Sequence, residues 1–215
     1  MVEAPLVIVW PCPLDVTGYA AAGQRVAVPA QACPDCGRRL VGWSGYWRWA
    51  RARPGERRLW IRRGRCSACR RSHALVPDFL LARRLDGVEA VGHGLALAAG
   101  GIGQRAVARH LDVPHTTARA WWRRFRARSP TLTAALVALA VGLDGVAVEL
   151  GADDGASAAL AALAVLWQRA RARWGERVGA VWRFWSRVTG GRALATTTSA
   201  PLAGRSGAGW MAPSP

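Results

Sequence analysis

Two CxxC pairs, set 29 residues apart, constrain the fold of this chain more than any other feature of its sequence. The first pair is Cys33 and Cys36, in CPDCG, and the second is Cys66 and Cys69, in CSACRRSH. Two tight turns that each supply two thiolates are a common way to build a tetrahedral Zn²⁺ site. The pattern therefore predicts one structural Zn²⁺ per chain, bound by these four cysteines.

Other roles for the cysteines remain open. A redox CxxC normally lies on a βαβ pattern, and no such pattern surrounds either pair. His73 follows the second pair closely, so its imidazole could replace one thiolate as a ligand. Cys12, the fifth cysteine, is expected to be a buried thiol, although a role at the metal site stays open.

The residues between the two pairs have the pattern of a β-hairpin. The stretches YWRWARA and RRLWIRR both alternate between two faces, as strands do. Pro54 and Gly55 lie between them and form a pair that a type II turn favours. A hairpin between two metal-binding turns is a zinc ribbon, which we predict over residues 31–76. Most of its tryptophans are expected to lie in the core rather than to stack on nucleic-acid bases.

The positive charge of the chain is concentrated around this ribbon. The formal net charge is +17, all 30 basic residues are arginine, and residues 31–76 carry +10. Codon choice in a GC-rich genome explains arginine in place of lysine, but it does not explain the clustering, which indicates a nucleic-acid partner. Alternatively, arginine stems cover tryptophan rings on a solvated strand face. The hairpin arginines expected to contact phosphate are Arg57, Arg58, Arg62 and Arg63.

A helix-turn-helix pattern follows the ribbon. In QRAVARHL, which starts at Gln104, apolar residues recur at helical spacing; DVP then breaks the helix, and a second helix begins near His115. Asp112 occupies the place in the tight turn where glycine is commoner, and Asp tolerates left-handed backbone better than most residues. Such a motif places its second helix in the major groove of DNA. A helical hairpin with a solvated basic face is the alternative.

The outward face of the second helix contains the residues expected to contact DNA. Ala118 and Trp121 face the core, and Arg119 is best placed to read guanine, because one guanidinium group can donate to O6 and N7 together. Arginines later on the helix are expected to contact phosphate. The predicted DNA contacts of this helix are His115, Thr116, Thr117, Arg119, Arg123, Arg124 and Arg126.

The predicted fold class is mainly α with a small β zinc ribbon. A stripe of tryptophan and valine within residues 157–188 is expected either to pack on the DNA-binding core or to form a homodimer through the C-terminal helices. The last residues have the composition of a disordered tail. The predicted divisions are an N-terminal segment (1–30), the zinc ribbon (31–76), a helix-turn-helix domain (77–130), a C-terminal helical region (131–192) and a disordered tail (193–215).

No segment has the pattern of an export signal or a membrane span. LVIVW is only five residues long and lacks a preceding basic region, and LTAALVALAVGL has half of the ~20 residues that a transmembrane helix needs. We therefore expect a cytoplasmic, nucleoid-associated protein in a compartment that keeps thiols reduced.

Several stretches resemble a bacterial family of helix-turn-helix proteins of unknown function that is widespread in GC-rich genomes. They are VIVWPCPLD, CPDCGRRLVGWSGYWRW, LWIRRGRCSACRRSHALVPDFLLARRLDG and VPHTTARAWWRRFRAR, with the later TGGR. The likeness covers residues 6–130 closely. The pairing of ribbon and helix-turn-helix is also similar to the N-terminal region of insertion-sequence transposases. The resemblance implies DNA binding with a mobile-element background.

These patterns predict a non-enzymatic protein that binds double-stranded DNA sequence-specifically, as a transcriptional regulator or a mobile-element accessory factor. The alternative is a transposase-derived or recombinase-type enzyme, which needs carboxylates that hold two metal ions about 3.5–4 Å apart. After the helix-turn-helix only five acidic residues remain, in an alanine-rich helical region without room for such a domain. A third possibility is a zinc-ribbon adaptor that binds protein or RNA.

Overall fold

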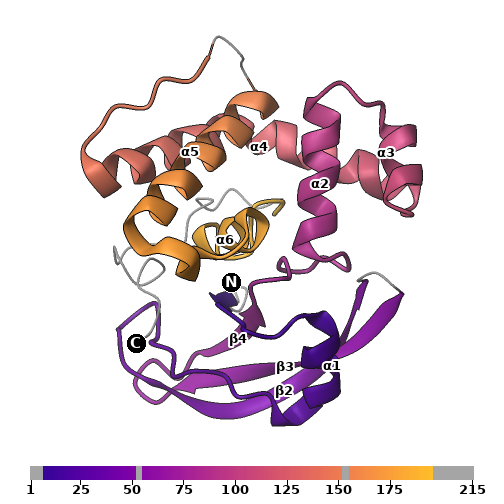
Figure 1. Ribbon diagram of the computed structural model, residues 1–215. Coiled ribbons are helices and arrows are strands. Elements are labelled where there is room, and N and C mark those ends of the chain that lie inside the picture. The colour runs from indigo at the N-terminus through magenta and orange to yellow at the C-terminus, as the bar shows by residue number, and fades with distance from the viewer. Residues whose placement is uncertain (1–6, 52–54, 152–154, 196–215) are drawn as a thin grey trace.

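The computed structural model describes residues 7–51, 55–151 and 155–195, which form a four-stranded sheet covered on one side by a layer of helices (Figure 1). The fold is mixed α and β, and helices make up the larger part. Among the described residues, no helix is both long enough and apolar enough to cross a membrane.

The sheet has the spatial order β1-β4-β3-β2. Its strands are β1 (Val7–Trp10), β2 (Leu40–Arg51), β3 (Glu56–Cys66) and β4 (Ser72–Pro77). β2 and β3 form the predicted antiparallel hairpin, and their register pairs Leu40 with Cys66, which brings the two CxxC turns to the same end. Pro54, expected in the connecting turn, lies outside the described residues. β1 pairs in parallel with β4, so the start of the chain belongs to the same sheet.

The hairpin buries one row of side chains and leaves its outer strand largely exposed. Leu59 and Ile61 on β3 are fully buried, because helices and the other strands surround that strand. β2 is the edge strand of the sheet, and Trp43, Trp47 and Trp49 on it are exposed. The expectation that most of the ribbon's tryptophans lie in the core is therefore wrong. An edge strand has a neighbour on one side only, and alternation along the sequence does not reveal which strand is at the edge.

The helical layer contains the two helices of the predicted helix-turn-helix pattern and the helices of the predicted C-terminal region, with different boundaries, together with α2 (Val88–Ala99). Its members after α2 are α3 (Gln104–His110), α4 (His115–Asp144), α5 (Ala156–Trp174), the 3₁₀ helix η2 (Gly175–Val178) and α6 (Val181–Val188). α4 runs continuously across the division expected between residues 130 and 131. Pro130 is exposed on this helix, so water can solvate the carbonyl that its missing N–H leaves free.

The last described segment, with α6, joins the helical layer to the sheet. Trp185 on α6 is buried and meets the Phe125 ring of α4 edge-on, with 6.1 Å between the centroids. Ser186 Oγ donates to the Leu80 carbonyl at 2.6 Å. The tryptophan and valine stripe thus packs partly on the core of its own chain, and a homodimer stays a prediction. Leu194 is buried as well, so the packed structure includes the first residues of the expected tail, whereas residues 196–215 lie outside the described part.

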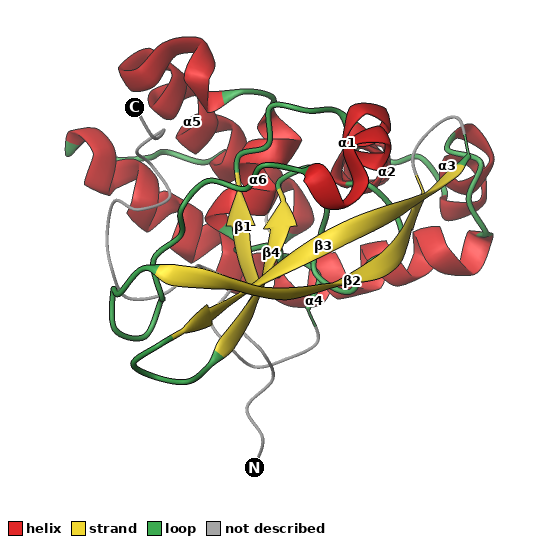
Figure 2. Cartoon of the chain, turned by 90° about the horizontal axis from the view of Figure 1, so that it is seen from below, coloured by secondary structure: helices red, strands yellow, loops and turns green. Residues whose placement is uncertain are grey.

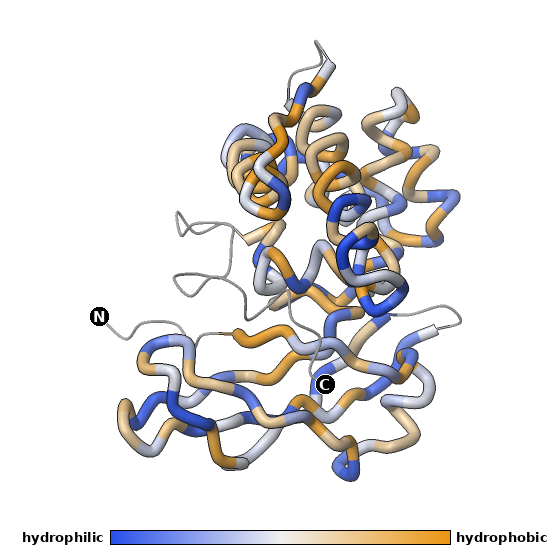
Figure 3. Tube along the Cα trace, turned by 60° about the vertical axis from the view of Figure 1, so that its left-hand side comes forward, coloured by the Kyte–Doolittle hydropathy of each residue, from blue (hydrophilic) through white to orange (hydrophobic). Residues whose placement is uncertain are grey.

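A single core continues from the sheet into the helices. The short helix α1 (Val16–Ala22), which continues into the 3₁₀ helix η1 (Gly23–Arg25), packs on β3. The Tyr19 hydroxyl of α1 donates to the Trp60 carbonyl at 2.9 Å, and the Tyr19 ring packs edge-on against Phe79. Figure 3 shows the helical layer lying next to the sheet, with hydrophobic stretches in both.

Candidate functional site

The two CxxC pairs form matching turns at one end of the hairpin. In the first turn, the Gly37 N–H donates to the Cys33 carbonyl at 2.8 Å; in the second, the Arg70 N–H donates to the Cys66 carbonyl at 3.0 Å. Gly37 and Arg70 each follow the second cysteine of their pair, and both have left-handed backbone, with φ of +73° and +61°. Because both turns have the same hydrogen bond and the same left-handed residue, the thiols of both turns point toward one place.

The four sulfur atoms have the spacing of a tetrahedral metal site. All four lie within 4.8 Å of one another, with Cys33 Sγ 4.0 Å from Cys69 Sγ and Cys36 Sγ 3.5 Å from Cys66 Sγ. Zn–S bonds of about 2.3 Å imply S···S edges of about 3.8 Å in a tetrahedron. None of the four forms a disulfide. The cluster fits a single metal ion, and a donor set of four thiolates is typical of zinc or iron.

Hydrogen bonds and burial move the pKa values of the clustered thiols in different directions. The Cys69 N–H donates to Cys66 Sγ at 3.4 Å, and this bond is the main cause that lowers the pKa of Cys66 to about 7. A hydrogen bond with Cys36 raises the pKa of Cys69 to about 12, and burial raises the pKa of Cys33. Of these three thiols, Cys66 is thus the most readily deprotonated, and a bound divalent cation would favour the thiolate form of its ligands.

His73 and Cys12, the two other candidate ligands, lie in different places. His73 is buried on β4 with its Nε2 atom 3.7 Å from Cys33 Sγ, and with Asp35 and Cys33 it forms a second group of potential ligand atoms. From this position the imidazole can hydrogen-bond a ligating thiolate or replace one. Cys12 is buried in the core, outside both groups, and burial raises its pKa to about 11. Among the described residues, the site therefore consists of the four cysteines with His73 beside them.

The helices α3 and α4 are joined by the tight turn that the sequence predicts. Asp112 has φ of +49°, so the expected left-handed position is confirmed. Val107 and Ala108 of α3 and Trp121 of α4 are buried between the helices. Gly94 of α2 approaches the Trp121 ring so closely that an added Cβ would lie 3.3 Å from it. The helices α2, α3 and α4 therefore form a compact group that fixes the direction in which α4 begins.

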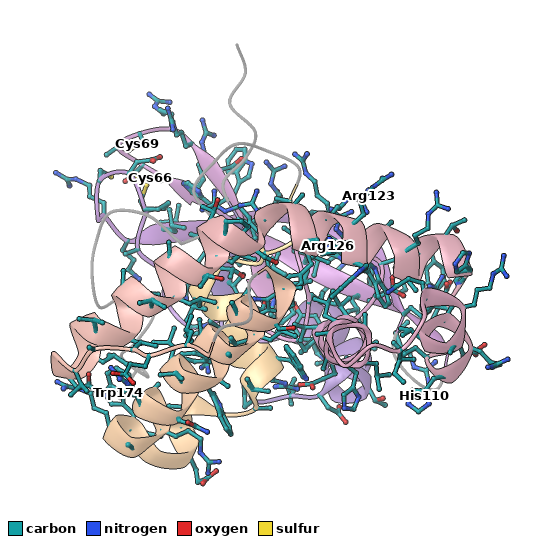
Figure 4. All side chains as sticks on the ribbon, turned by 90° about the horizontal axis from the view of Figure 1, so that it is seen from above. Cys66, Cys69, His110, Arg123, Arg126 and Trp174 are labelled. Carbon is teal, nitrogen blue, oxygen red and sulfur yellow. The ribbon has the colours of Figure 1, made fainter. Side chains whose placement is uncertain are left out.

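Arginines occupy the outward face of the first half of α4. Arg119, Arg123 and Arg126 are exposed, and Figure 4 labels Arg123 and Arg126 along this helix. Their spacing of four and three residues places them on one face, over about 10 Å of helix. Of the other predicted contacts, Thr116 is exposed, and the remaining three are partly buried: His115, Thr117 and Arg124.

A cavity of about 240 Å³ lies beside the first turns of α4, and its lining is strongly basic. Arg83, Arg84 and Arg124 line it together with Thr116 and Thr117. Burial and the neighbouring Arg124 charge lower the pKa of Arg84. The acidic residue of the lining forms an ion pair elsewhere, since Asp86 Oδ1 lies 2.8 Å from Arg51 Nη1. The positive charge around the cavity is therefore largely uncompensated, as a binding site for an anion requires. No local motif pointed to Arg83 and Arg84.

The structure does not gather the four hairpin arginines expected to contact phosphate into one surface. Arg62 donates to the carbonyls of Val26 (3.0 Å) and Gln24 (2.6 Å), and Arg63 donates to Ser72 Oγ at 2.5 Å. Arg57 donates to the carbonyl of Glu56. Arg58 is exposed and lies 5.0 Å from the centre of the Trp47 ring. The alternative interpretation, arginine stems against tryptophan rings, thus describes part of this face.

The fold and the cysteine cluster define a mixed α/β protein with a candidate tetracysteine metal centre. Residues 33–96 match a domain of unknown function, DUF6431, and this range includes all four clustered cysteines, the hairpin, β4 and most of α2. No curated protein and no solved structure matches the chain. The match fits the expected family of unknown function, and it ends before α3 begins.

Proposed function

We propose that this protein binds double-stranded DNA sequence-specifically, with α3 and α4 acting as a helix-turn-helix and α4 entering the major groove. The observation that carries the proposal is the exposed arginine face of α4 directly after a tight, left-handed turn. The sequence of α4 holds no acidic residue before Asp144, so nothing on the first half of the helix offsets this positive charge. A base-reading helix needs such a face.

The cavity at the start of α4 supports the same proposal. Arg83 and Arg84 precede α2, whereas Arg124 belongs to α4, so arginines from two parts of the chain line the cavity. A phosphate bound between them would fix the position of α4 on the duplex without carrying sequence information. Arg119, on the exposed face, would then read a base edge.

The four cysteines would hold one structural Zn²⁺, which stabilises the hairpin by tying its two turns together. Such a site supplies folding free energy rather than chemistry, because all four coordination positions belong to the protein. Two of the acidic residues after the first half of α4 form ion pairs in the described part of the chain: Asp144 Oδ1 lies 2.7 Å from Arg169 Nη1, and Glu176 pairs with Arg171.

The test is duplex binding by the Arg119→Ala variant, with Arg177→Ala as the control of equal charge. Arg177 is exposed on η2 and is not part of the arginine face on the first half of α4. The preferred duplex is first selected from a random pool with the unmodified protein. Arg119→Ala should then lose about 1–3 kcal/mol on that duplex and much less on a scrambled one, because only the preferred duplex presents the base edge. Arg177→Ala should lower the affinity for the preferred duplex and for the scrambled duplex slightly and by the same factor.

Two outcomes contradict the proposal. If Arg119→Ala weakens the preferred and the scrambled duplex by the same factor, α4 supplies charge and does not read sequence. If no duplex is enriched from the random pool, sequence-specific binding itself is absent, and an adaptor that binds protein or RNA becomes the better hypothesis. Measuring over a salt series separates lost phosphate contacts, which change the salt slope by about one unit each, from lost base contacts.

A further inference from the structure

Three exposed tryptophans follow one another along β2. The exposed fractions are 57% for Trp43, 39% for Trp47 and 56% for Trp49, and no other tryptophan in the described part of the chain is as exposed as these. Indole rings are usually at least half buried, because leaving them in water forgoes their large hydrophobic gain. A row of exposed rings on one strand indicates a binding surface.

Arginines are stacked against two of these rings. The Arg65 guanidinium lies 4.4 Å from the centre of the Trp43 ring, and that of Arg58 lies 5.0 Å from the centre of the Trp47 ring. Stacked guanidinium groups hold the rings in place and add positive charge beside them. Trp47 is further supported by Trp60, whose ring meets it edge-on at 5.3 Å. The rings are therefore oriented by the protein while much of their surface stays in contact with water.

The rings are spaced for a linear ligand. Trp47 and Trp49 are two residues apart on a strand, so they share a face and lie about 6.6 Å apart along it. Trp43 to Trp49 covers about 20 Å of β2, with a bulge between Gly42 and Ser44 that redirects the strand beside Trp43. Between residues 41 and 50, no described strand pairs with the outer edge of β2, so the edge is open over these residues (Figure 2).

We propose that this surface, defined by Trp43, Trp47 and Trp49 with Arg58 and Arg65, binds single-stranded DNA by stacking its bases on the indole rings. Bases stack on aromatic side chains whatever their sequence, and arginines beside the rings attract the phosphates. Residues 31–76 carry a net charge of +10, which favours a polyanion over an apolar peptide or a neutral surface. The choice of DNA rests on the proposed duplex-binding function, because local opening of a bound duplex exposes such a strand.

The experiment measures binding of a labelled thymidine oligonucleotide to the full chain and to two variants. Trp49→Ala should bind about 5- to 100-fold more weakly, since base–indole stacking is lost at one position. Trp167→Ala is the matched control, because Trp167 lies on α5 and also has an arginine, Arg171, stacked 5.0 Å from its ring centre. This control should bind like the unmodified protein. Trp49 is more than half exposed, so its removal should leave the fold intact.

A second measurement uses the unmodified protein and therefore does not depend on how a variant folds. Stacked bases should quench tryptophan fluorescence as the oligonucleotide is added, and duplex DNA of the same length should quench it less. The proposal is overturned if the oligonucleotide does not bind, if Trp49→Ala and Trp167→Ala lose affinity equally, or if RNA of matching sequence binds more tightly. Loss of preferred-duplex binding in Arg119→Ala, with single-strand binding intact, reports on the proposed function alone.

Discussion

Arg70 has left-handed backbone at the position where the matching turn uses Gly37. For a residue with a Cβ atom this conformation costs about 1–2 kcal/mol, whereas glycine adopts it freely. The second CxxC turn therefore holds a strained residue, and its hydrogen bond to the Cys66 carbonyl together with the clustered thiols keeps it there. A metal ion bound by the four thiols would link the two turns and offset this cost. At the scale of single residues, the geometry around the cysteines is thus organised for metal binding.

The Cys66→Ser variant tests this organisation. We expect purified Cys66→Ser protein to contain less than half an equivalent of zinc per chain, because a hydroxyl is a poor replacement for one of four thiolates. Structural zinc can supply an apparent ~10–16 kcal/mol, so the variant should also unfold at a clearly lower temperature. Metal analysis and thermal unfolding measure both effects.

Cys12→Ser is the control for that prediction. Cys12 is buried outside the cluster, so its variant should keep one equivalent of zinc. If Cys66→Ser keeps a full equivalent of zinc, the Cys66 thiolate is not needed to bind the ion. A small loss in Cys66→Ser together with a large loss in His73→Ala would instead assign the fourth ligand to the imidazole.

Helix α6 packs closely against α2 in the helical layer. At Gly92 of α2 an added Cβ atom would lie 2.1 Å from the Trp182 ring of α6. Glycine is normally unfavourable inside a helix by about 1 kcal/mol. At position 92 it is needed because any side chain would collide with the Trp182 ring. The close approach allows Trp185 and Phe184 of α6 to reach the core.

The Gly92→Ala variant should therefore be less stable, by about 1–3 kcal/mol, because the Trp182 ring has to move. Gly142 of α4 is the matched control, since a Cβ atom there meets nothing within 4 Å and the residue is helical. Gly142→Ala should raise the free energy of unfolding by about 0.5–1 kcal/mol. Denaturant unfolding at one pH measures the free energy of unfolding of both variants. A stabilised Gly92→Ala protein would mean that α6 does not sit against α2 in this way.

At the scale of the whole molecule, the buried hydrophobic residues form one continuous cluster rather than two. Residues of the sheet such as Ile61, of α1 such as Tyr19, and of the helical layer such as Phe125 and Trp185 belong to it. Two layers that share a core are expected to unfold together. The candidate metal centre lies at one end of this structure, yet its effect on stability should reach the helices.

Removal of metal by a chelator should lower the thermal midpoint of the whole protein. Tryptophan fluorescence reports on both layers, because described tryptophans lie in the sheet and on α4, α5 and α6, whereas far-ultraviolet circular dichroism reports mainly on the helices. Both should give the same midpoint before chelation and the same lower midpoint after it, because the transition is cooperative. If the circular dichroism midpoint stays constant while fluorescence shifts, the metal-binding turns unfold independently of the helical layer.

Local sequence patterns were sufficient for the features that depend on neighbouring residues. The CxxC spacing predicted the cysteine cluster, two alternating stretches predicted the hairpin, and Asp112 was expected to be left-handed where the structure has φ of +49°. The family resemblance in the N-terminal half is consistent with the domain of unknown function that matches residues 33–96. The DNA contacts and the partners remain predictions that the proposed experiments test.

The sequence by itself determined the hairpin strands, the two CxxC turns and the two helices on either side of Asp112, because hydrophobic period and turn chemistry act over a few residues. Only the tertiary structure decided which of them meet. β1 pairs with β4 across more than 60 residues, with Val7 opposite Ala74, and this placed β2 at the edge with its tryptophans exposed. The tertiary structure also brought Arg83 and Arg84 close to the start of α4, and it buried Leu194. Such contacts depend on how whole elements cover one another, which no local pattern contains.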